Sequence, residues 1–219
     1  MKSLFYLTLL LGSTALFSQP NYQQQLGQAL GQFSQAESPD QYAASTAAFT
    51  ELAKAEEATW HANYYAAFAA AVQSFRTEDQ EDRDRLVSAA QASLDLAKSA
   101  GAPEAEVVAL QARVYQARIS VDPASRAMQY GPKTMGMLFP AKAKAPENPR
   151  LLLLLAQMVE RTPAGYGGGP DRALPLVQAS LKAFENWSSE DPFAPSWGED
   201  EAAKLLGKLD PTSIKSRKK

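Results

Sequence analysis

The sequence predicts an all-α protein in which helical hairpins stack as an α-α superhelix, with about four helix pairs and a C-terminal capping helix. Three observations predict it. Apolar residues recur at helical spacing along most of the chain, proline- and glycine-containing segments interrupt that spacing, and similar short segments recur every 40 to 44 residues. The recurring segments contain Lys54, Lys98, Lys142 and Lys182. Such a period is typical of an α-solenoid built from helix pairs, and an irregular helical bundle is the alternative.

The clearest helical hairpin spans residues 148–184. Asn148 is a favoured N-cap residue, and Pro149 suits the first helical position because that position needs no amide donor. Residues 151–155 are five successive leucines, which place apolar side chains on every side of this helix. Neighbouring helices must therefore cover it.

A turn and a second helix complete this hairpin. Residues 162–170 contain prolines that cannot continue a helix and glycines that tolerate positive φ, so we expect a tight turn there. The second helix carries one apolar stripe that ends at Phe184. If this second helix begins at Pro170, Pro175 lies in its interior and removes a backbone hydrogen bond. The helix therefore either begins near Leu174 or kinks at Pro175.

The remaining segments predict further helices and two irregular stretches. We expect a charged loop over residues 76–84 and an irregular link at residues 130–132, where Tyr-Gly-Pro opposes one long helix. Residues 188–198 contain two prolines and a tryptophan, and should cross the surface as an extended strap pinned by its aromatic residues. The other predicted helices cover residues 22–36, 41–55, 59–75, 86–97, 104–120, 132–143 and 199–209.

The chain is predicted to hold one helical repeat domain, residues 19–219, preceded by a signal peptide, residues 1–18. Lys2 precedes an uncharged apolar run, and Ser18 suits cleavage. The run is short and leads directly into polar residues, which is typical of a secretory leader; an uncleaved N-terminal anchor is the alternative. We therefore expect an exported, periplasmic or secreted protein without a membrane span after cleavage.

Composition excludes several classes of function. The absence of cysteine excludes a disulfide framework and a thiol nucleophile. The net charge of −2 argues against nucleic acid as a partner, because phosphate binding needs a concentrated positive surface. The basic residues at 215–219 are expected to form a solvated, frayed end.

Two motifs in the clearest hairpin carry a family resemblance. Residues 145–150 read Ala-Pro-Glu-Asn-Pro-Arg before the first helix, and residues 171–174 read Asp-Arg-Ala-Leu at the second, after a glycine-rich turn. This pattern resembles tetratricopeptide-repeat-like proteins exported by gram-negative bacteria. The resemblance implies a TPR-like helical scaffold and a role in protein binding, and it identifies architecture rather than activity.

No residue pattern points to catalysis, a cofactor or a metal. His61 is the single histidine, and a typical transition-metal site would need further His or Cys ligands, so we expect a structural or surface role for it. Residues 165–169 are glycine-rich and precede a helix, but they lack the Lys-Ser/Thr ending and the preceding strand of a phosphate-binding loop. We therefore expect a protein that is not an enzyme.

Aromatic side chains are the best candidates for binding. In a stacked superhelix, inner helices line a concave surface on which aromatic residues anchor a peptide or an apolar ligand. The alternative is that most of them fill the core, which the helical stripe from Trp60 through Tyr64 to Phe75 favours. The candidate ligand- or partner-binding residues are Trp60, Tyr64, Tyr65, Tyr130, Arg150 and Tyr166.

Two functions fit these observations. The first is a non-catalytic scaffold that holds a protein or peptide partner in the bacterial periplasm or envelope. The second is a small-ligand-binding protein that resembles the tetratricopeptide-fold periplasmic components associated with transport. A deep, aromatic-lined cavity favours the ligand, and a shallow groove with exposed Tyr and Arg favours the protein partner.

Overall fold

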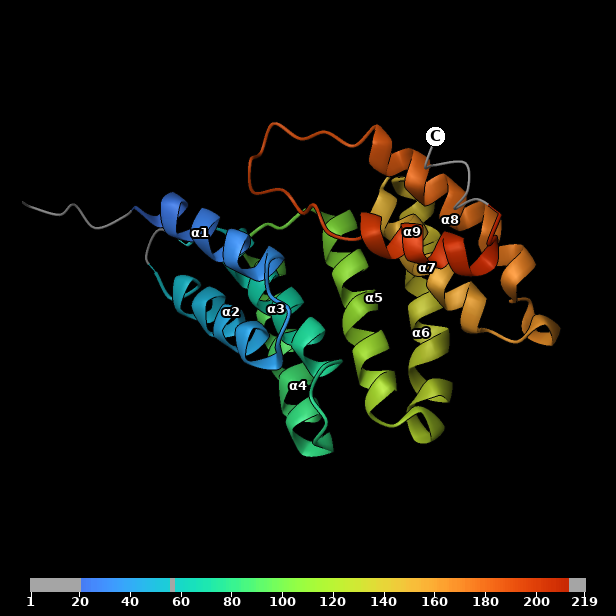
Figure 1. The fold of residues 1–219 in the computed structure, drawn as a ribbon, viewed down its shortest axis with the longest axis horizontal. Helices are drawn as coiled ribbons and strands as arrows, with labels where there is room; N and C mark the ends of the chain where they lie inside the picture. Colours follow the sequence, from blue (N-terminus) through green and yellow to red (C-terminus); the bar gives the residue numbers. More distant parts are fainter. Residues whose placement is uncertain (1–20, 56–57, 213–219) are drawn as a thin grey trace, which may run out of the picture.

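The computed structural model describes residues 21–55 and 58–212, and within them every regular element is a helix: nine α-helices, one short 3-10 helix and no strand (Figure 1). This confirms the predicted all-α class. The predicted signal peptide and the basic tail lie outside the described residues. The helices are α1 (Tyr22–Ser34), α2 (Pro39–Leu52), α3 (Trp60–Ser74), α4 (Gln80–Ser99), α5 (Glu104–Val121), α6 (Pro123–Lys144), α7 (Pro149–Arg161), η1 (Ala164–Tyr166), α8 (Pro170–Glu185) and α9 (Glu199–Leu209).

The helices pack as successive pairs. Within the part of the chain that the structure describes, α1 packs on α2, α3 on α4, α5 on α6 and α7 on α8, and each pair contacts the next (Figure 1). The first helices of the later pairs also meet, since α5 contacts both α3 and α7. α9 packs on α8 and, less extensively, on α7. These are the four pairs and the C-terminal helix expected from the sequence.

Side-chain caps fix where several helices begin. Asn21 and Ser38 form capping boxes at α1 and α2, in which the cap side chain and the third helical residue satisfy each other's backbone amides. Asp79 caps α4, and Asn148 accepts two backbone amides at the start of α7. The Asp79 cap starts α4 at Gln80, inside the predicted loop over residues 76–84, which is therefore shorter than expected.

The α7–α8 hairpin forms the apolar centre of the C-terminal half. The five leucines 151–155 are at most 4% exposed, as their distribution around the helix predicted. Burial of each leucine contributes about 1.5–3 kcal/mol relative to exposure. The Ser180 hydroxyl of α8 donates to the Pro149 carbonyl at 2.8 Å and ties the two helices together where they are buried.

The turn between α7 and α8 depends on glycine. Gly167 and Gly169 have φ of 85° and 104°, which residues with a side chain rarely adopt. At Gly168, a Cβ atom would collide with the carbonyl oxygens of Thr162 and Val159. The predicted tight turn is thus present, and α8 begins at Pro170 and continues through its interior proline.

The prediction of an irregular link at residues 130–132 is wrong. α6 is one continuous helix that contains Pro132 and Pro140. Each proline removes a backbone hydrogen bond, but Thr134 and Leu138 are fully buried against the neighbouring helices, and the Thr134 hydroxyl bonds the Tyr130 carbonyl at 2.7 Å. Packing therefore outweighs the local cost of the prolines. The aromatic stripe of α3 also ends earlier than expected, because Phe75 at its C-cap is 39% exposed.

No helix among the described residues is long and apolar enough to cross a membrane.

Candidate functional site

A long connection between α8 and α9, residues 186–198 and hereafter the strap, contacts α3 in the N-terminal half of the molecule. It leaves α8, reaches toward the side of α1 and α3, and returns to α9 (Figure 1). Its extended course across the surface, pinned by aromatic residues, confirms the prediction for residues 188–198. Trp197 stacks on Phe68 with ring centroids 4.8 Å apart. The strap is therefore held against the N-terminal half.

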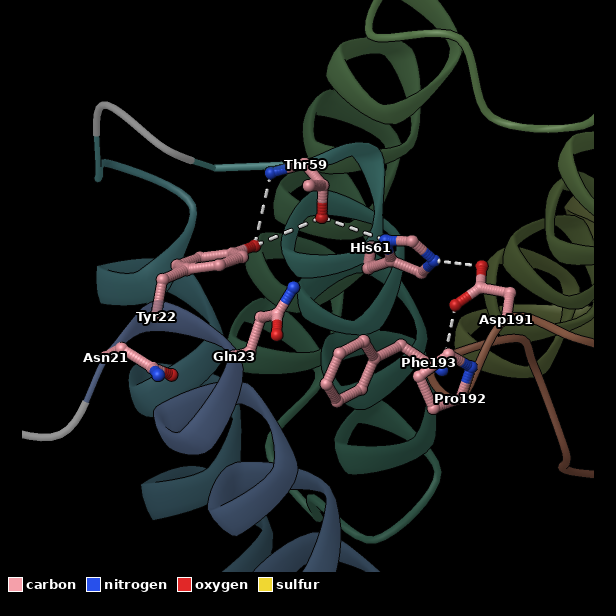
Figure 2. Close-up of a pocket in the computed structure, with 8 residues that line it drawn as sticks. All are labelled: Asn21, Tyr22, Gln23, Thr59, His61, Asp191, Pro192 and Phe193. Atoms are coloured by element: carbon pink, nitrogen blue, oxygen red, sulfur yellow. Dashed lines mark hydrogen bonds and ion pairs between the residues drawn. The ribbon is translucent and has the colours of Figure 1, made fainter.

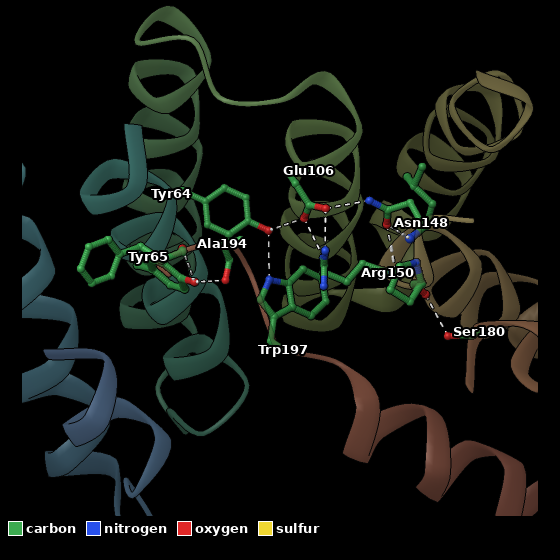
Figure 3. Close-up of polar contacts among 11 residues, drawn as sticks. Tyr64, Tyr65, Glu106, Asn148, Arg150, Ser180, Ala194 and Trp197 are labelled. Atoms are coloured by element: carbon green, nitrogen blue, oxygen red, sulfur yellow. Dashed lines mark hydrogen bonds and ion pairs between the residues drawn. The ribbon is translucent and has the colours of Figure 1, made fainter. Parts of the chain in front are cut away.

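Tyr64 and Tyr65 of α3 hold the strap by hydrogen bonds. The Tyr65 hydroxyl donates to the Phe193 carbonyl at 3.0 Å, and the Trp197 indole N–H donates to the Tyr64 hydroxyl at 3.0 Å (Figure 3). Burial is the main reason why the pKa of both tyrosines lies above the usual value. Both hydroxyls therefore stay protonated and keep their role as donors.

A buried ion pair lies next to these tyrosines. Arg150 is fully buried and donates twice to Glu106, at 2.7 Å to each carboxylate oxygen, and Asn148 donates to the same carboxylate at 2.7 Å (Figure 3). Tyr64 also donates to Glu106, at 3.3 Å. This network joins α3, α5 and α7, so Arg150 and Tyr64 hold the helices together beneath the strap.

A pocket of about 530 Å³ opens between the start of α1, the start of α3 and the strap (Figure 2). Its lining combines aromatic, apolar and amide side chains around one imidazole. The lining residues are Asn21, Tyr22, Gln23, Thr59, His61, Asp191, Pro192 and Phe193.

One chain of hydrogen bonds forms a wall of this pocket. The Tyr22 hydroxyl lies 3.3 Å from Thr59 Oγ1, which lies 2.8 Å from His61 Nδ1 (Figure 2). The other ring nitrogen, His61 Nε2, lies 2.6 Å from Asp191 Oδ2. The Phe193 amide donates to Asp191 Oδ1 at 2.9 Å. The wall thus crosses from α1 to α3 to the strap.

The charge on Asp191 is stabilised in this setting. Partial burial opposes its ionisation, but the Phe193 amide and the His61 ring outweigh burial and hold the pKa of this carboxyl below the usual value. His61 is 8% exposed, and Trp60 stacks on it with centroids 3.8 Å apart. The imidazole is therefore fixed between an indole, a hydroxyl and a carboxylate.

The pocket suits a flat, largely apolar ligand. Tyr22, Phe193 and Pro192 offer ring surfaces, and the amides of Asn21 and Gln23 offer hydrogen-bond donors at the rim. Concave sites of about 300–1,000 Å³ with such a lining are typical of small-molecule binding. Among the residues that the structure describes, no group of three or more His, Cys, Asp or Glu side chains could hold a metal ion.

A second cavity, of about 360 Å³, lies between α1 and α2 and is a weaker candidate. Glutamines and one glutamate line much of it, and it offers no aromatic surface. Its lining residues are Gln25, Gln28, Ala29, Gln32, Ala48, Glu51, Leu52 and Ala55.

None of the candidate binding residues named from the sequence lines the pocket beside the strap. Trp60 stacks on His61, and Tyr64 and Tyr65 bond the strap. Arg150 is fully buried in its ion pair with Glu106. Tyr130 and Tyr166 lie elsewhere: Tyr130 is on α6, and Tyr166 on η1 is 86% exposed. These two stay predictions for a partner surface.

Tyr130 belongs to a separate aromatic and cationic cluster. Its ring pairs with Tyr115 of α5 at 5.2 Å. Arg118 and Lys133 lie over the Tyr130 ring at 5.7 and 5.3 Å. The cluster lies on the α5–α6 pair rather than beside the pocket.

Sequence reasoning missed Tyr22, Asp191 and Phe193 as site residues. His61 meets Asp191 across 130 positions of sequence, and no local pattern indicates that contact. One signal was available. The strap was predicted to be pinned by aromatic residues, and a segment of this kind has to pack on another part of the protein.

Comparison with known proteins shows a similarity to a solved structure. No protein-family model matches the chain, and no curated protein matches it. Among solved structures, the chain is similar to the HusA haemophore from Porphyromonas gingivalis, with 31% sequence identity and a TM-score of 0.78. The match covers 87% of this chain and 94% of that chain.

Proposed function

We propose that this chain, which belongs to the same family as the HusA haemophore, is an exported protein that binds haem or a related planar tetrapyrrole. The observation that carries the proposal is the match to that haemophore over 94% of its length, at 31% identity and with the same fold. Of the two functions that fit the sequence, the match favours the ligand-binding protein over the scaffold. The proposal contains no catalytic step.

The pocket beside the strap is the proposed site. A tetrapyrrole is flat and apolar with a polar edge, and the pocket combines the ring surfaces of Tyr22 and Phe193 with the amides of Asn21 and Gln23. Its volume of about 530 Å³ lies in the range of small-molecule sites. The predicted protein partner then acts as the acceptor to which the loaded protein passes its ligand.

A titration with hemin tests this proposal. Binding is followed by the Soret band and by quenching of tryptophan fluorescence, since Trp60 stacks directly on a residue of the pocket lining. Replacing Phe193 by alanine removes the main ring surface that the strap contributes, and we expect about tenfold weaker binding from the lost stacking and burial.

Tyr166→Ala is the matched control, because Tyr166 is an aromatic residue that is 86% exposed and lies outside the pocket lining. It should bind hemin as the unmodified protein does. Absence of saturable binding contradicts the proposed function. Equal binding by Phe193→Ala and the control contradicts the proposed site.

A further inference from the structure

We infer that the outward face of α6 docks this protein on a negatively charged lipid surface. The face combines exposed apolar side chains in one stripe with basic side chains beside them, and α6 contains four basic and no acidic residues. α6 contributes no residue to the lining of either cavity described above, so the inference is independent of the proposed ligand.

The stripe consists of apolar side chains that stay exposed in the described chain. Met128 is 84% exposed and Phe139 is 53% exposed. The interval between them is close to three helical turns of about 3.6 residues each, so both lie on the same side of α6. Pro132 is exposed between them on that side. Exposed apolar patches of this kind mark interaction surfaces.

The stripe faces away from the protein, since the opposite side of α6 supplies its packing contacts. Thr134 and Leu138 are fully buried and Ala141 is 8% exposed, where α6 packs on α5 and α7. Met128 and Phe139 are therefore not core residues of this chain. They are exposed because α6 already meets its need for packing on the other side.

Lysine side chains border the stripe. In the helical register, Lys133 lies on one side of it and Lys142 on the other. Arg126 and Lys144 are engaged in ion pairs, whereas Lys133 and Lys142 form none within the described part of the chain. Two positive charges are thus left for an external partner.

This combination of groups fits a lipid surface better than two other occupants. A second copy of the chain would bring the same cations together, because every charged residue of α6 is basic. An acidic protein would pair with the lysines, but its charged surface offers no contact for Met128 and Phe139. At an anionic bilayer, apolar side chains enter the boundary between headgroups and acyl chains while lysines contact the headgroups. Both parts of the face are then satisfied.

Flotation with lipid vesicles tests the inference. The protein is used without the predicted signal peptide, whose apolar run would itself bind lipid. We expect it to float with vesicles of equal phosphatidylglycerol and phosphatidylcholine, and to remain in solution with phosphatidylcholine alone. Because the formal net charge of the sequence is −2, its overall charge does not attract it to the anionic vesicles. Binding should weaken as salt screens the lysines.

Substitutions separate the apolar stripe from the charge. Phe139→Asp should weaken binding to anionic vesicles about tenfold. Leu96→Asp is the matched control, because Leu96 is an apolar residue of α4 that is 59% exposed and lies outside α6. It should bind as the unmodified protein does. Lys133→Gln and Lys142→Gln should each weaken binding about fivefold. Unchanged helical circular dichroism and hemin titration verify that each variant is folded.

A variant without residues 215–219 controls for the other basic part of the sequence, and it should float as the unmodified protein does. The inference is overturned if the protein does not float with anionic vesicles, if Phe139→Asp and Leu96→Asp bind equally, or if removal of residues 215–219 abolishes flotation. Retention on immobilised polyglutamate without flotation would identify an acidic protein as the partner and would also overturn it. Hemin titration is a separate readout, so each of these failures leaves the proposed function in place.

Discussion

The α7–α8 hairpin and the pocket beside the strap are built in opposite ways. In the hairpin, residues close in sequence determine the structure: Asn148 caps α7, five leucines are buried around it, and glycines shape its turn. In the pocket, His61 meets Asp191 from a distant part of the chain. The first region gives the fold its stability, and the second leaves side chains available for a ligand.

The largest effect on stability is expected where α5 meets α7. Glu106→Gln leaves the fully buried Arg150 without a charged partner, which should lower the free energy of unfolding by about 3–5 kcal/mol, measured by urea denaturation. Glu104→Gln is the matched control on the same helix. Its ion pair with Lys144 is exposed, so no measurable change is expected. Equal effects of the two variants would show that Arg150 does not depend on Glu106.

The turn of the hairpin should be the next most sensitive place. Gly168→Ala puts a Cβ atom against the carbonyl oxygens of Thr162 and Val159, and we expect a loss of about 1–3 kcal/mol from the forced backbone shift. Gly165→Ala in the same turn meets no atom within 4 Å and should be close to neutral. Denaturation of both variants measures the difference, and a neutral Gly168→Ala would contradict the close approach of the backbone.

A smaller effect should link the strap to the pocket. Tyr65→Phe removes the hydroxyl that donates to the carbonyls of Phe193 and Ala194, and it should cost about 1 kcal/mol of stability. It should also weaken hemin binding, because the strap then holds Phe193 less firmly. Tyr115→Phe is the control, since the Tyr115 hydroxyl makes no hydrogen bond within the described residues. If Tyr65→Phe binds hemin as the unmodified protein does, the Tyr65 hydrogen bonds to the strap do not contribute to hemin binding.

The smallest effect concerns the junction of α4 and α6 in acid. The Arg126 guanidinium beside Asp84 holds the pKa of that carboxyl below its usual value. Because the pKa of Asp84 is lower in the folded than in the unfolded state, the ionised carboxylate stabilises the folded protein at pH values above the unfolded-state pKa of about 4. This stabilisation is lost as the pH falls through the folded-state pKa. Melting temperatures should therefore differ between the unmodified protein and Asp84→Asn at pH 7 and converge below pH 4. A constant difference across that range would contradict the pair.

The fold was largely predictable because its signals are local. Caps such as Asn148 and Asp79, apolar periodicity and glycine-rich turns all act within one or two helical turns. Prediction failed at Pro132, where packing of Thr134 and Leu138 overrides the local preference of proline. That outcome depends on neighbouring helices, so the segment alone could not reveal it.

The pocket was not predictable from the sequence because it depends on long-range contacts. Trp60, Tyr64 and Tyr65 were named as candidates because they are aromatic, but the spacing of Trp60 and Tyr64 favoured the core, and none of the three lines the pocket. We expected a structural or surface role for His61 because the sequence offers no further His or Cys ligand. The sequence could not show that the strap brings Asp191 to the His61 ring. Residues in an irregular connection show no periodic pattern, so their contacts cannot be predicted from the spacing of apolar residues.

Binding of a tetrapyrrole beside the strap is tested most directly by mapping the ligand on the protein. Gallium(III) protoporphyrin IX is diamagnetic, and its ring current shifts the amide resonances of residues that lie against it in a ¹H–¹⁵N spectrum. The account predicts the largest shifts at Tyr22, Thr59, His61 and Phe193, with little change along α7 and α8. Largest shifts at Tyr115 and Tyr130, or no shifts at any position, would contradict it.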